Sequence, residues 1–182
     1  PHAYKAAVLF GKATEFMHFV TVGDAGNSAD SRPVTFIGAN YYFGNVDYEF
    51  KIGKYEVTNA QYCAFLNAVA SSDPYGLYNI NMGDSSYPSR GGIIRSGSEG
   101  SYTYSTIASR ANLPVNWVSW RSAARFCNWL HNGMQNDPNT TEYGAYDAST
   151  FVGTGPDKQD QAAHFSDARY WIPTTNEWYK AA

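Results

Sequence analysis

The stretch LPVNWVSWRSAARFCNWL, residues 113–130, carries the strongest indication of the fold. Ser119 is a favourable helix N-cap, and the residues after it place apolar side chains at helical spacing on one face. That face consists of Trp120, Ala123, Ala124, Cys127 and Leu130, widened by Phe126 and Trp129. Asn132 and Gly133 follow and supply a C-cap. The stretch therefore predicts an amphipathic helix between Ser119 and Asn132.

A capping box opens another helix earlier in the chain. Thr58 is its N-cap and Gln61 its N3 residue, ahead of apolar residues at i, i+3, i+4 and i+7. This second stripe consists of Tyr62, Phe65, Leu66 and Val69. Asp73 and Pro74 are expected to end the helix, because proline cannot continue it.

A second capping box, Thr174 with Glu177, stands near the end of the chain. The helix that it opens breaks off at Ala182 after about two turns, with no Gly or Pro to end it. So short a helix is marginal on its own. We therefore expect the natural protein to continue and this chain to be a fragment of it.

Short strands are expected mainly before the first helix. β-branched and aromatic residues with turn-forming neighbours mark three candidates, at residues 16–22, 34–37 and 46–54. Residues 101–105 alternate like a fourth strand. Together with the helices, these segments indicate an α+β fold with short strands, two to three helices and long loops.

Two long stretches rich in Gly, Ser, Asn and Tyr connect these elements, at residues 71–112 and 132–168. Loops of this length are often functional, or are packed by their own side chains. Along the chain we expect a strand-and-turn segment over residues 1–45 and the main domain over residues 46–182.

The composition excludes several classes of protein. The chain has 182 residues, of which 43% are hydrophobic, so one domain with a real core is expected. Only 16% are charged and the net charge is −3, which argues against a nucleic-acid-binding surface. The longest apolar run, residues 6–10, is far shorter than the roughly 20 residues of a membrane span.

The two cysteines fall on the two predicted helices and outside any Cys-x-x-Cys pair, which weakens zinc or thioredoxin-type chemistry. Packing of the helices would allow a disulfide between Cys63 and Cys127. The alternative is two buried free thiols that act as small hydrophobic residues. No Lys, Arg or His helix-N-terminus setting that would make either one a low-pKa nucleophile is evident.

The other polar residues give weaker indications of a site. His131 lies near a helix C-terminus, where it would interact favourably with the helix dipole. Asp157, Asp160 and Asp167 could bind calcium together with nearby carbonyl groups, although most aspartates here occur in turn contexts. Nucleotide-binding glycine motifs are absent from the sequence.

Tyrosine is the unusual feature of the composition, with 15 residues among 30 aromatics. In adaptable binding loops Tyr supplies contact area at low entropic cost, whereas in ordinary domains aromatics form the core and anchor loops. Both interpretations remain open for the loop tyrosines. The candidates for ligand binding are Tyr75, Tyr78, Tyr87, Tyr102, Tyr104, Tyr143 and Tyr146.

Three segments resemble the formylglycine-generating enzyme family, also called sulfatase-modifying factors. Residues 52–62 are similar to its "YEVTNAQY" opening, residues 113–130 to its "PVxxVSWxxAxxFCxWL" block, and residues 170–178 to its "YRLPTEAEWE" block. Order and spacing agree as well. The resemblance covers about residues 46–182, and residues 1–45 match only loosely.

The resemblance implies the irregular, C-type-lectin-like α+β fold of that family. Its motif blocks are mostly scaffold, so Thr58, Ser119 and Thr174 would be helix caps. The motif aromatics would belong to the core. They are Tyr55, Trp117, Trp120 and Trp178.

The resemblance also implies a chemistry that this chain would not contain in full. Active members oxidise a substrate cysteine with oxygen, using a copper-binding cysteine pair that follows the "LPTEAEWE" block, and their calcium loops come later too. Neither Cys63 nor Cys127 matches the catalytic positions, so we assign no catalytic, cofactor-binding or metal-binding residue here. Copper and calcium are expected only with a further C-terminal part.

Two functions from different classes therefore stay open. One is the N-terminal portion of a formylglycine-generating-enzyme-like domain in an exported bacterial protein. The other is a non-catalytic lectin-like module, at the cell surface or secreted, that binds a protein or glycan ligand; a structural, self-associating subunit is a variant of it. Low charge, the lack of an initiator Met and a Cys63–Cys127 bridge would favour export.

Overall fold

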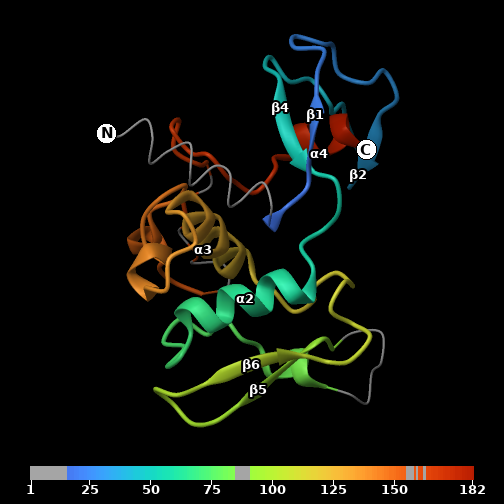
Figure 1. Ribbon diagram of the computed structural model, residues 1–182. Coiled ribbons are helices and arrows are strands. Elements are labelled where there is room, and N and C mark those ends of the chain that lie inside the picture. The colour runs from blue at the N-terminus through green and yellow to red at the C-terminus, as the bar shows by residue number, and fades with distance from the viewer. Residues whose placement is uncertain (1–15, 85–90, 155–157, 159, 162) are drawn as a thin grey trace. The chain divides into compact units, whose positions relative to one another are not determined.

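The computed structural model describes residues 16–84, 91–154, 158, 160–161 and 163–182. Its elements are three helices and three two-stranded antiparallel sheets, joined by long connections that include short 3₁₀ turns (Figure 1). The chain divides into two compact units. Among the described residues, unit 1 comprises 16–17 and 55–172, and unit 2 comprises 18–54 and 173–182. The fold is thus mixed α+β, as the sequence predicts.

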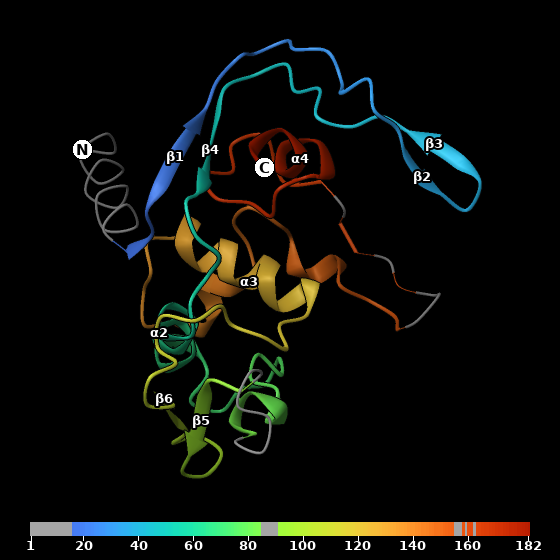
Figure 2. The same cartoon turned by 90° about the vertical axis from the view of Figure 1, so that its right-hand side faces the viewer.

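The core of unit 1 lies between helix α2 (Asn59–Val69) and helix α3 (Trp120–His131). Figure 2 shows α2 nearly end-on while α3 runs across the view. Phe65 is fully buried, and its ring lies 5.3 Å from the ring centroids of both Phe126 and Trp129. Burying one such side chain stabilises the fold by about 1.5–3 kcal/mol. The two predicted apolar stripes therefore meet in one aromatic core.

Both helices begin where the sequence predicts. Thr58 and Gln61 form the complete capping box of α2, and the Ser119 hydroxyl accepts the hydrogen bond from the backbone N–H of Ser122 at the start of α3. Helix α3 ends at the predicted C-cap, Asn132. Helix α2 ends earlier than predicted, because the chain already leaves helical geometry at Ala70.

The hairpin of strands β5 (Ile93–Ser96) and β6 (Thr103–Thr106) packs on α2. The Asn67 side chain on α2 bonds the backbone of Tyr104 twice, through its amide nitrogen (2.8 Å) and its oxygen (2.9 Å). The approach is close at Gly92, where a Cβ atom would lie 2.2 Å from the Asn59 amide. Any larger residue there would push the hairpin away from the helix.

The long connection after α3 is folded against that helix. It contains the 3₁₀ turns η2 (Pro138–Thr141) and η3 (Ala148–Thr150), as the connection before β5 contains η1 (Ile80–Gly83). Asn128 on α3 is fully buried, and its side chain donates to the carbonyls of Thr141 (2.7 Å) and Tyr146 (2.9 Å). It also accepts from the Tyr146 N–H (2.8 Å). A buried amide thus determines the path of a segment without regular structure.

Unit 2 combines a β-ladder with the last helix. Strands β1 (Phe19–Val22) and β4 (Phe50–Gly53) pair antiparallel, and α4 (Thr175–Ala181) begins with the predicted Thr174–Glu177 capping box. The buried Glu177 carboxylate also accepts a hydrogen bond from the Tyr48 hydroxyl (2.9 Å). This buried acid joins the helix start to the chain before β4.

The second hairpin of unit 2, β2 (Val34–Phe36) with β3 (Ala39–Tyr41), has no buried residue. In Figure 2 it projects beyond β1, β4 and α4. Its two-residue turn places Ile37 at φ 49° and Gly38 at φ 76°. This left-handed geometry suits the glycine, but it is a strained conformation for a β-branched residue. Ile37 is nevertheless 88% exposed.

The expected burial of the motif aromatics is wrong for three of the four. Tyr55, Trp117 and Trp178 are 66%, 43% and 62% exposed. Tyr55 and Trp117 lie near a short pairing in which the Val115 N–H bonds the Val57 carbonyl, outside the aromatic core between α2 and α3. The remaining one, Trp120, is half-buried and packs on the α3 core cluster. Within the described ranges, no helix is both long and apolar enough to cross a bilayer.

Candidate functional site

The two cysteines are buried and unpaired, so the disulfide that the sequence allowed is not formed. Cys127 packs with Ala145 and Tyr146 in the cluster behind α3. Cys63 lies beside Asn67, whose amide points towards β6 and also bonds the Cys63 carbonyl. The two thiols therefore face different neighbours, although their helices share a core.

Both thiols are also poor nucleophiles and poor metal ligands. Burial raises the pKa of Cys63, against a smaller opposing effect of the Asn67 hydrogen bond. Burial alone raises the pKa of Cys127 to about 12. Since the thiolate is the reactive and metal-binding form, neither residue is prepared for redox or copper chemistry at neutral pH. They act as small core residues, the second of the two sequence-based interpretations.

The aspartates considered for calcium are not brought together. Burial raises the pKa of Asp160, but hydrogen bonds from Arg121 and Lys158, both 2.8 Å, outweigh it and lower the pKa overall. Its charge is thus already neutralised. Asp167 is exposed and Asp157 lies outside the described residues. No group of three acidic, His or Cys side chains in the described part of the chain could hold a metal ion.

Three of the loop tyrosines turn out to be core residues, which corrects their assignment to a binding surface. Tyr78, Tyr104 and Tyr146 are each less than 10% exposed. Their hydroxyls bond backbone groups: Tyr78 donates to the Ile93 carbonyl (3.2 Å) and Tyr104 to the Ala70 carbonyl (2.8 Å). Tyr146 accepts from the Ile172 N–H (3.0 Å). The Tyr62 hydroxyl in α2 donates to the Leu77 carbonyl (2.8 Å), as those of Tyr78 and Tyr104 do to theirs. These rings are buried in the core, and their hydroxyls satisfy backbone groups there.

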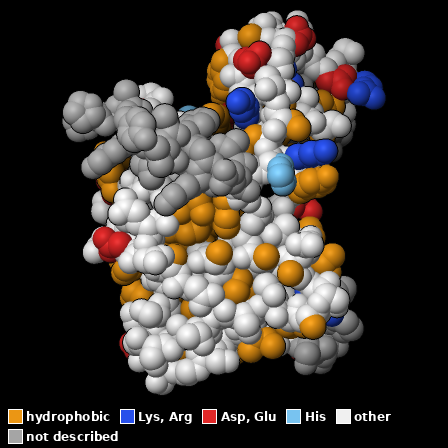
Figure 3. Space-filling view, viewed as in Figure 1, with side chains coloured by type: hydrophobic (Ala, Val, Ile, Leu, Met, Phe, Trp, Pro, Cys, Tyr) orange, Lys and Arg blue, Asp and Glu red, His pale blue; other side chains and the backbone are white. Residues whose placement is uncertain are grey.

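Of the remaining candidates, Tyr75, Tyr102 and Tyr143 are at least partly exposed, and a cation lies over the ring of two of them. The Arg125 guanidinium lies 4.4 Å from the Tyr75 ring centroid, and the Arg95 guanidinium lies 4.3 Å from that of Tyr102. Such contacts stabilise by about 0.5–1 kcal/mol at exposed sites. Tyr143 is 63% exposed. Tyr87 falls outside the described residues. The face shown in Figure 3, over α2, β5 and β6, carries few charged side chains.

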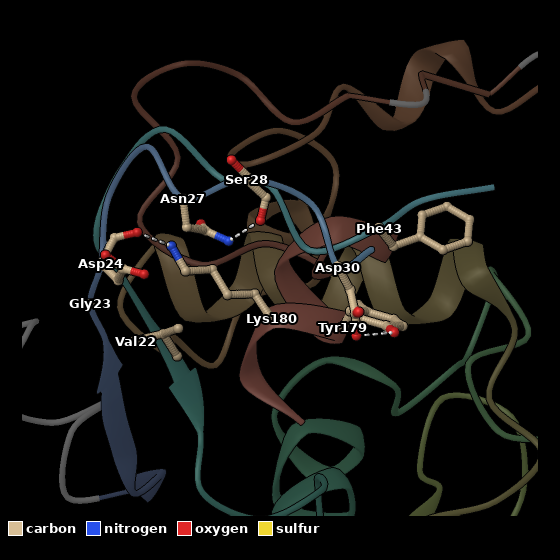
Figure 4. A pocket seen from close by; sticks show the side chains of 9 residues that line it. All are labelled: Val22, Gly23, Asp24, Asn27, Ser28, Asp30, Phe43, Tyr179 and Lys180. Atoms are coloured by element: carbon tan, nitrogen blue, oxygen red, sulfur yellow. Dashed lines mark hydrogen bonds between the residues drawn. The ribbon is translucent and has the colours of Figure 1, made fainter. Parts of the chain in front are cut away.

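A hollow within unit 2 was not predicted from the sequence. It has a volume of about 620 Å³ and is open to solvent (Figure 4). The loop after β1 supplies one side and the end of α4 the other. The lining residues are Val22, Gly23, Asp24, Asn27, Ser28, Asp30, Phe43, Tyr179 and Lys180. This lining combines two aromatic rings with carboxylate, amide, hydroxyl and ammonium groups.

The α4 side chains of the hollow are held by hydrogen bonds. The Tyr179 hydroxyl donates to the Asp30 carboxylate (2.9 Å), and Lys180 donates to the Asp24 carbonyl (2.7 Å; Figure 4). Asp30 also forms a two-pronged ion pair with Arg32. The side-chain bond from Arg32, followed by its backbone N–H and the Tyr179 hydroxyl, holds the pKa of Asp30 well below its usual range. Asp30 is therefore a carboxylate at any ordinary pH.

Gly44, which follows the lining residue Phe43, is held by two hydrogen bonds. The Asn27 amide donates to the Gly44 carbonyl (2.7 Å), and the Asn176 side chain accepts from the Gly44 N–H (3.1 Å). Gly44 has φ 97°, and a Cβ atom there would lie 3.0 Å from the Tyr179 ring. Only glycine allows this approach without strain. The side chains and backbone beside the hollow are thus held in position by hydrogen bonds and by the close approach at Gly44.

Comparison with known protein families agrees with the motifs and the fold. The model for the sulfatase-modifying factor enzyme 1-like domain, FGE-sulfatase, matches residues 38–182. The chain belongs to this family. The match takes in all three helices of the FGE-sulfatase region and begins within the β2–β3 turn. Neither the curated proteins nor the solved structures that were compared include a match to this chain.

Proposed function

We propose that this chain is a scaffold and ligand-binding part of an FGE-sulfatase domain, and that its own cysteines take no part in oxidation. The observation that carries the proposal is the burial of both thiols, with raised pKa values, in two separate environments of the α2–α3 core. A copper-dependent cysteine oxidase needs thiolates that can reach both metal and substrate. Cys63 and Cys127 do not fit that requirement.

The binding half of the proposal is supported by the accessible surfaces. The hollow of unit 2 offers rings and hydrogen-bonding groups held in position, which is the composition of small-ligand sites. The exposed rings of Tyr75 and Tyr143 in unit 1 add apolar contact area. The lectin-like scaffold inferred from the motifs would suit such a role. Export stays part of the proposal on the low charge alone, because the unpaired cysteines remove the argument from a disulfide.

Thiol accessibility tests the cysteine half directly. We expect N-ethylmaleimide to leave the native protein unmodified over hours and to add twice per chain in urea, as read by intact mass. In a Cu(I) titration against a competing chelator, Cys63→Ala and Cys127→Ala should bind as much copper as the unsubstituted chain. Rapid native alkylation, or copper affinity that either substitution abolishes, would overturn the proposal.

Self-association is a second candidate, favoured by the β2–β3 hairpin. Its exposed side chains include Val34, Phe36, Ile37 and Tyr41, and a two-stranded ribbon leaves both edges unpaired. Light scattering should then give a mass that rises with concentration, and Phe36→Lys should return it to one protomer. One protomer at every concentration would remove this candidate.

A further inference from the structure

The geometry of unit 2 points to a neutral saccharide as the ligand of the hollow between the β1 loop and α4. This inference deepens the proposed binding function and rests on it. The hollow, about 620 Å³, falls within the range of about 300–1,000 Å³ for small-molecule sites, and its openness suits a ligand that lies across it. Pyranose rings have apolar C–H faces and a rim of hydroxyls, so they need aromatic rings beside mixed hydrogen-bonding groups.

Aromatic surface is present at one end of the hollow. Phe43 and Tyr179 both line it, with ring centroids 6.1 Å apart and planes tilted by 43°. Phe43 also stacks on Tyr41, with an interplanar angle of 8°. Gly44 covers part of the Tyr179 ring, and the hydroxyl of that ring is tied to Asp30. Both rings are thus positioned before a ligand arrives, which reduces the entropy lost on binding.

The charges of the hollow argue against an ionic ligand. Asp30 is paired with Arg32, and the Lys180 ammonium is occupied by the carbonyls of Asp24 and Val46. The Lys180 ammonium also shares the hollow with the Asp24 carboxylate, so charges of both signs are mixed there and neither a phosphate nor a polycation would meet a concentrated opposite charge. Neutral hydroxyl groups remain suited to such a surface, because they both donate and accept hydrogen bonds.

Two polar side chains remain to meet those hydroxyls. Asp24 and Ser28 are exposed lining residues, and neither side chain bonds another described residue. The Asp24 carboxylate is an acceptor, and the Ser28 hydroxyl is both donor and acceptor. They lie on the loop side of the hollow, whereas Phe43 marks its other end in Figure 4. A sugar that stacks on the rings would place its hydroxyl rim towards this loop.

Amide chemical-shift titration of the chain with maltose, cellobiose and N,N′-diacetylchitobiose tests the inference. At least one probe should give saturable shifts, in the millimolar range, at amides of residues 23–30, 43–44 and 179–180. Inorganic phosphate should give none there. Phe43→Ala should weaken binding about tenfold or more, while Tyr42→Ala, which removes an exposed neighbouring ring outside the lining, should leave it unchanged.

Two smaller substitutions keep the test valid if the Phe43→Ala variant does not fold. Ser28→Ala and Asp24→Asn alter only rim groups and should each weaken binding severalfold with an unchanged amide spectrum. Affinity unaffected by both, or no saturable shift at the hollow with any of the three sugars, would overturn the inference. Sugar shifts confined to unit 1 tyrosines, or saturation of the hollow by phosphate, would refute it too, yet would leave the proposed binding function standing. The thiol tests fail or succeed independently of all these outcomes.

Discussion

The α2–α3 core of unit 1 and the β2–β3 hairpin of unit 2 use similar apolar residues to opposite effect. In the core, Phe65 is surrounded by rings and has no exposed surface. In the hairpin, Phe36 is 64% exposed and Ile37 is 88% exposed. Hydrophobic content alone therefore does not place a residue inside. The core forms because two capped helices present their apolar stripes to each other, whereas the hairpin is held by its backbone pairing and its turn.

Removing a ring from the core should have the largest effect. Phe65→Ala should lower the free energy of unfolding by about 3–5 kcal/mol, because it deletes a buried ring and leaves a cavity. The matched change in the hairpin, Phe36→Ala, should cost less than about 0.5 kcal/mol. Urea unfolding monitored by tryptophan fluorescence and circular dichroism measures both. Equal losses would mean that the hairpin is packed in solution.

The second-largest loss of stability is expected from removing a buried polar side chain. This expectation holds if buried hydrogen bonds, rather than apolar packing, hold the segment after α3. Asn128→Ala leaves the carbonyls of Thr141 and Tyr146 without this donor, and we expect a loss of about 2–4 kcal/mol. Gln135→Ala, which removes an exposed amide bond, is the control and should change stability by under about 0.5 kcal/mol. Hydrogen exchange at Tyr146 reports the local effect. Unchanged protection there would show that packing alone holds the segment.

A substitution in the β2–β3 turn should raise stability, whereas those above lower it. Ile37→Asn creates the Asn-Gly pair that this left-handed turn favours, and it should stabilise the hairpin by about 1 kcal/mol. Ile37→Val keeps the β-branch and should gain nothing. Amide exchange in β2 and β3 should slow only in the Asn variant. A loss of stability instead would indicate that the exposed Ile37 side chain makes a contact in solution.

The smallest effect is expected at the end of α3, from pH. Burial and, second, the nearby Arg169 charge lower the pKa of His131 below 6.5, against a smaller opposing effect of Asp167. The unfolded chain therefore takes up this proton more readily than the folded one. Stability that is present above pH 6.5 is lost as the pH falls through the lowered folded value.

Urea midpoints between pH 7 and pH 5 measure this loss. His131→Asn keeps an acceptor for the Arg169 N–H without titrating, so its midpoint should fall less on acidification. The sequence suggested that His131 acts as a cation near the helix dipole. In the structure its Nδ1 atom accepts a hydrogen bond from the Arg169 N–H, and burial favours the neutral form of the ring. Identical pH profiles for the two proteins would contradict this interpretation.

Local physics explains what the sequence predicted correctly. The Thr58 and Thr174 capping boxes and the α3 stripe depend on residues within four positions of each other, so the pattern contains all the information needed. The end of α2 was misplaced because Pro74 sets only a latest limit for a helix that ends at Val69. Burial of Tyr78 and Tyr104 depended on the course of the loops, which no local pattern shows.

The hollow of unit 2 shows more clearly what a local sequence pattern cannot predict. Tyr179 and Asp30 are separated by 149 positions, and only the fold brings them together. The turn-rich loop at residues 23–30 was recognisable, as was the helix that begins after Thr174. The contact between this loop and α4 could not be predicted, because hydrogen bonds between distant segments leave no periodic pattern in one sequence. The exposure of Trp117 and Trp178 was missed because an apolar residue type does not by itself place a side chain in the core.

The buried tyrosine hydroxyls have a consequence for how this protein can change. Tyr62, Tyr78 and Tyr104 all bond backbone carbonyls, at Leu77, Ile93 and Ala70. Every amino acid brings the same carbonyl to its position. These hydrogen bonds therefore do not depend on which side chain stands at the accepting position, although all three accepting residues are buried. Loss of one tyrosine hydroxyl, in contrast, leaves a buried carbonyl unsatisfied. The tyrosines thus hold the chain at three points, and exposed residues between those points, such as Ile80, can change without removing one of these hydrogen bonds.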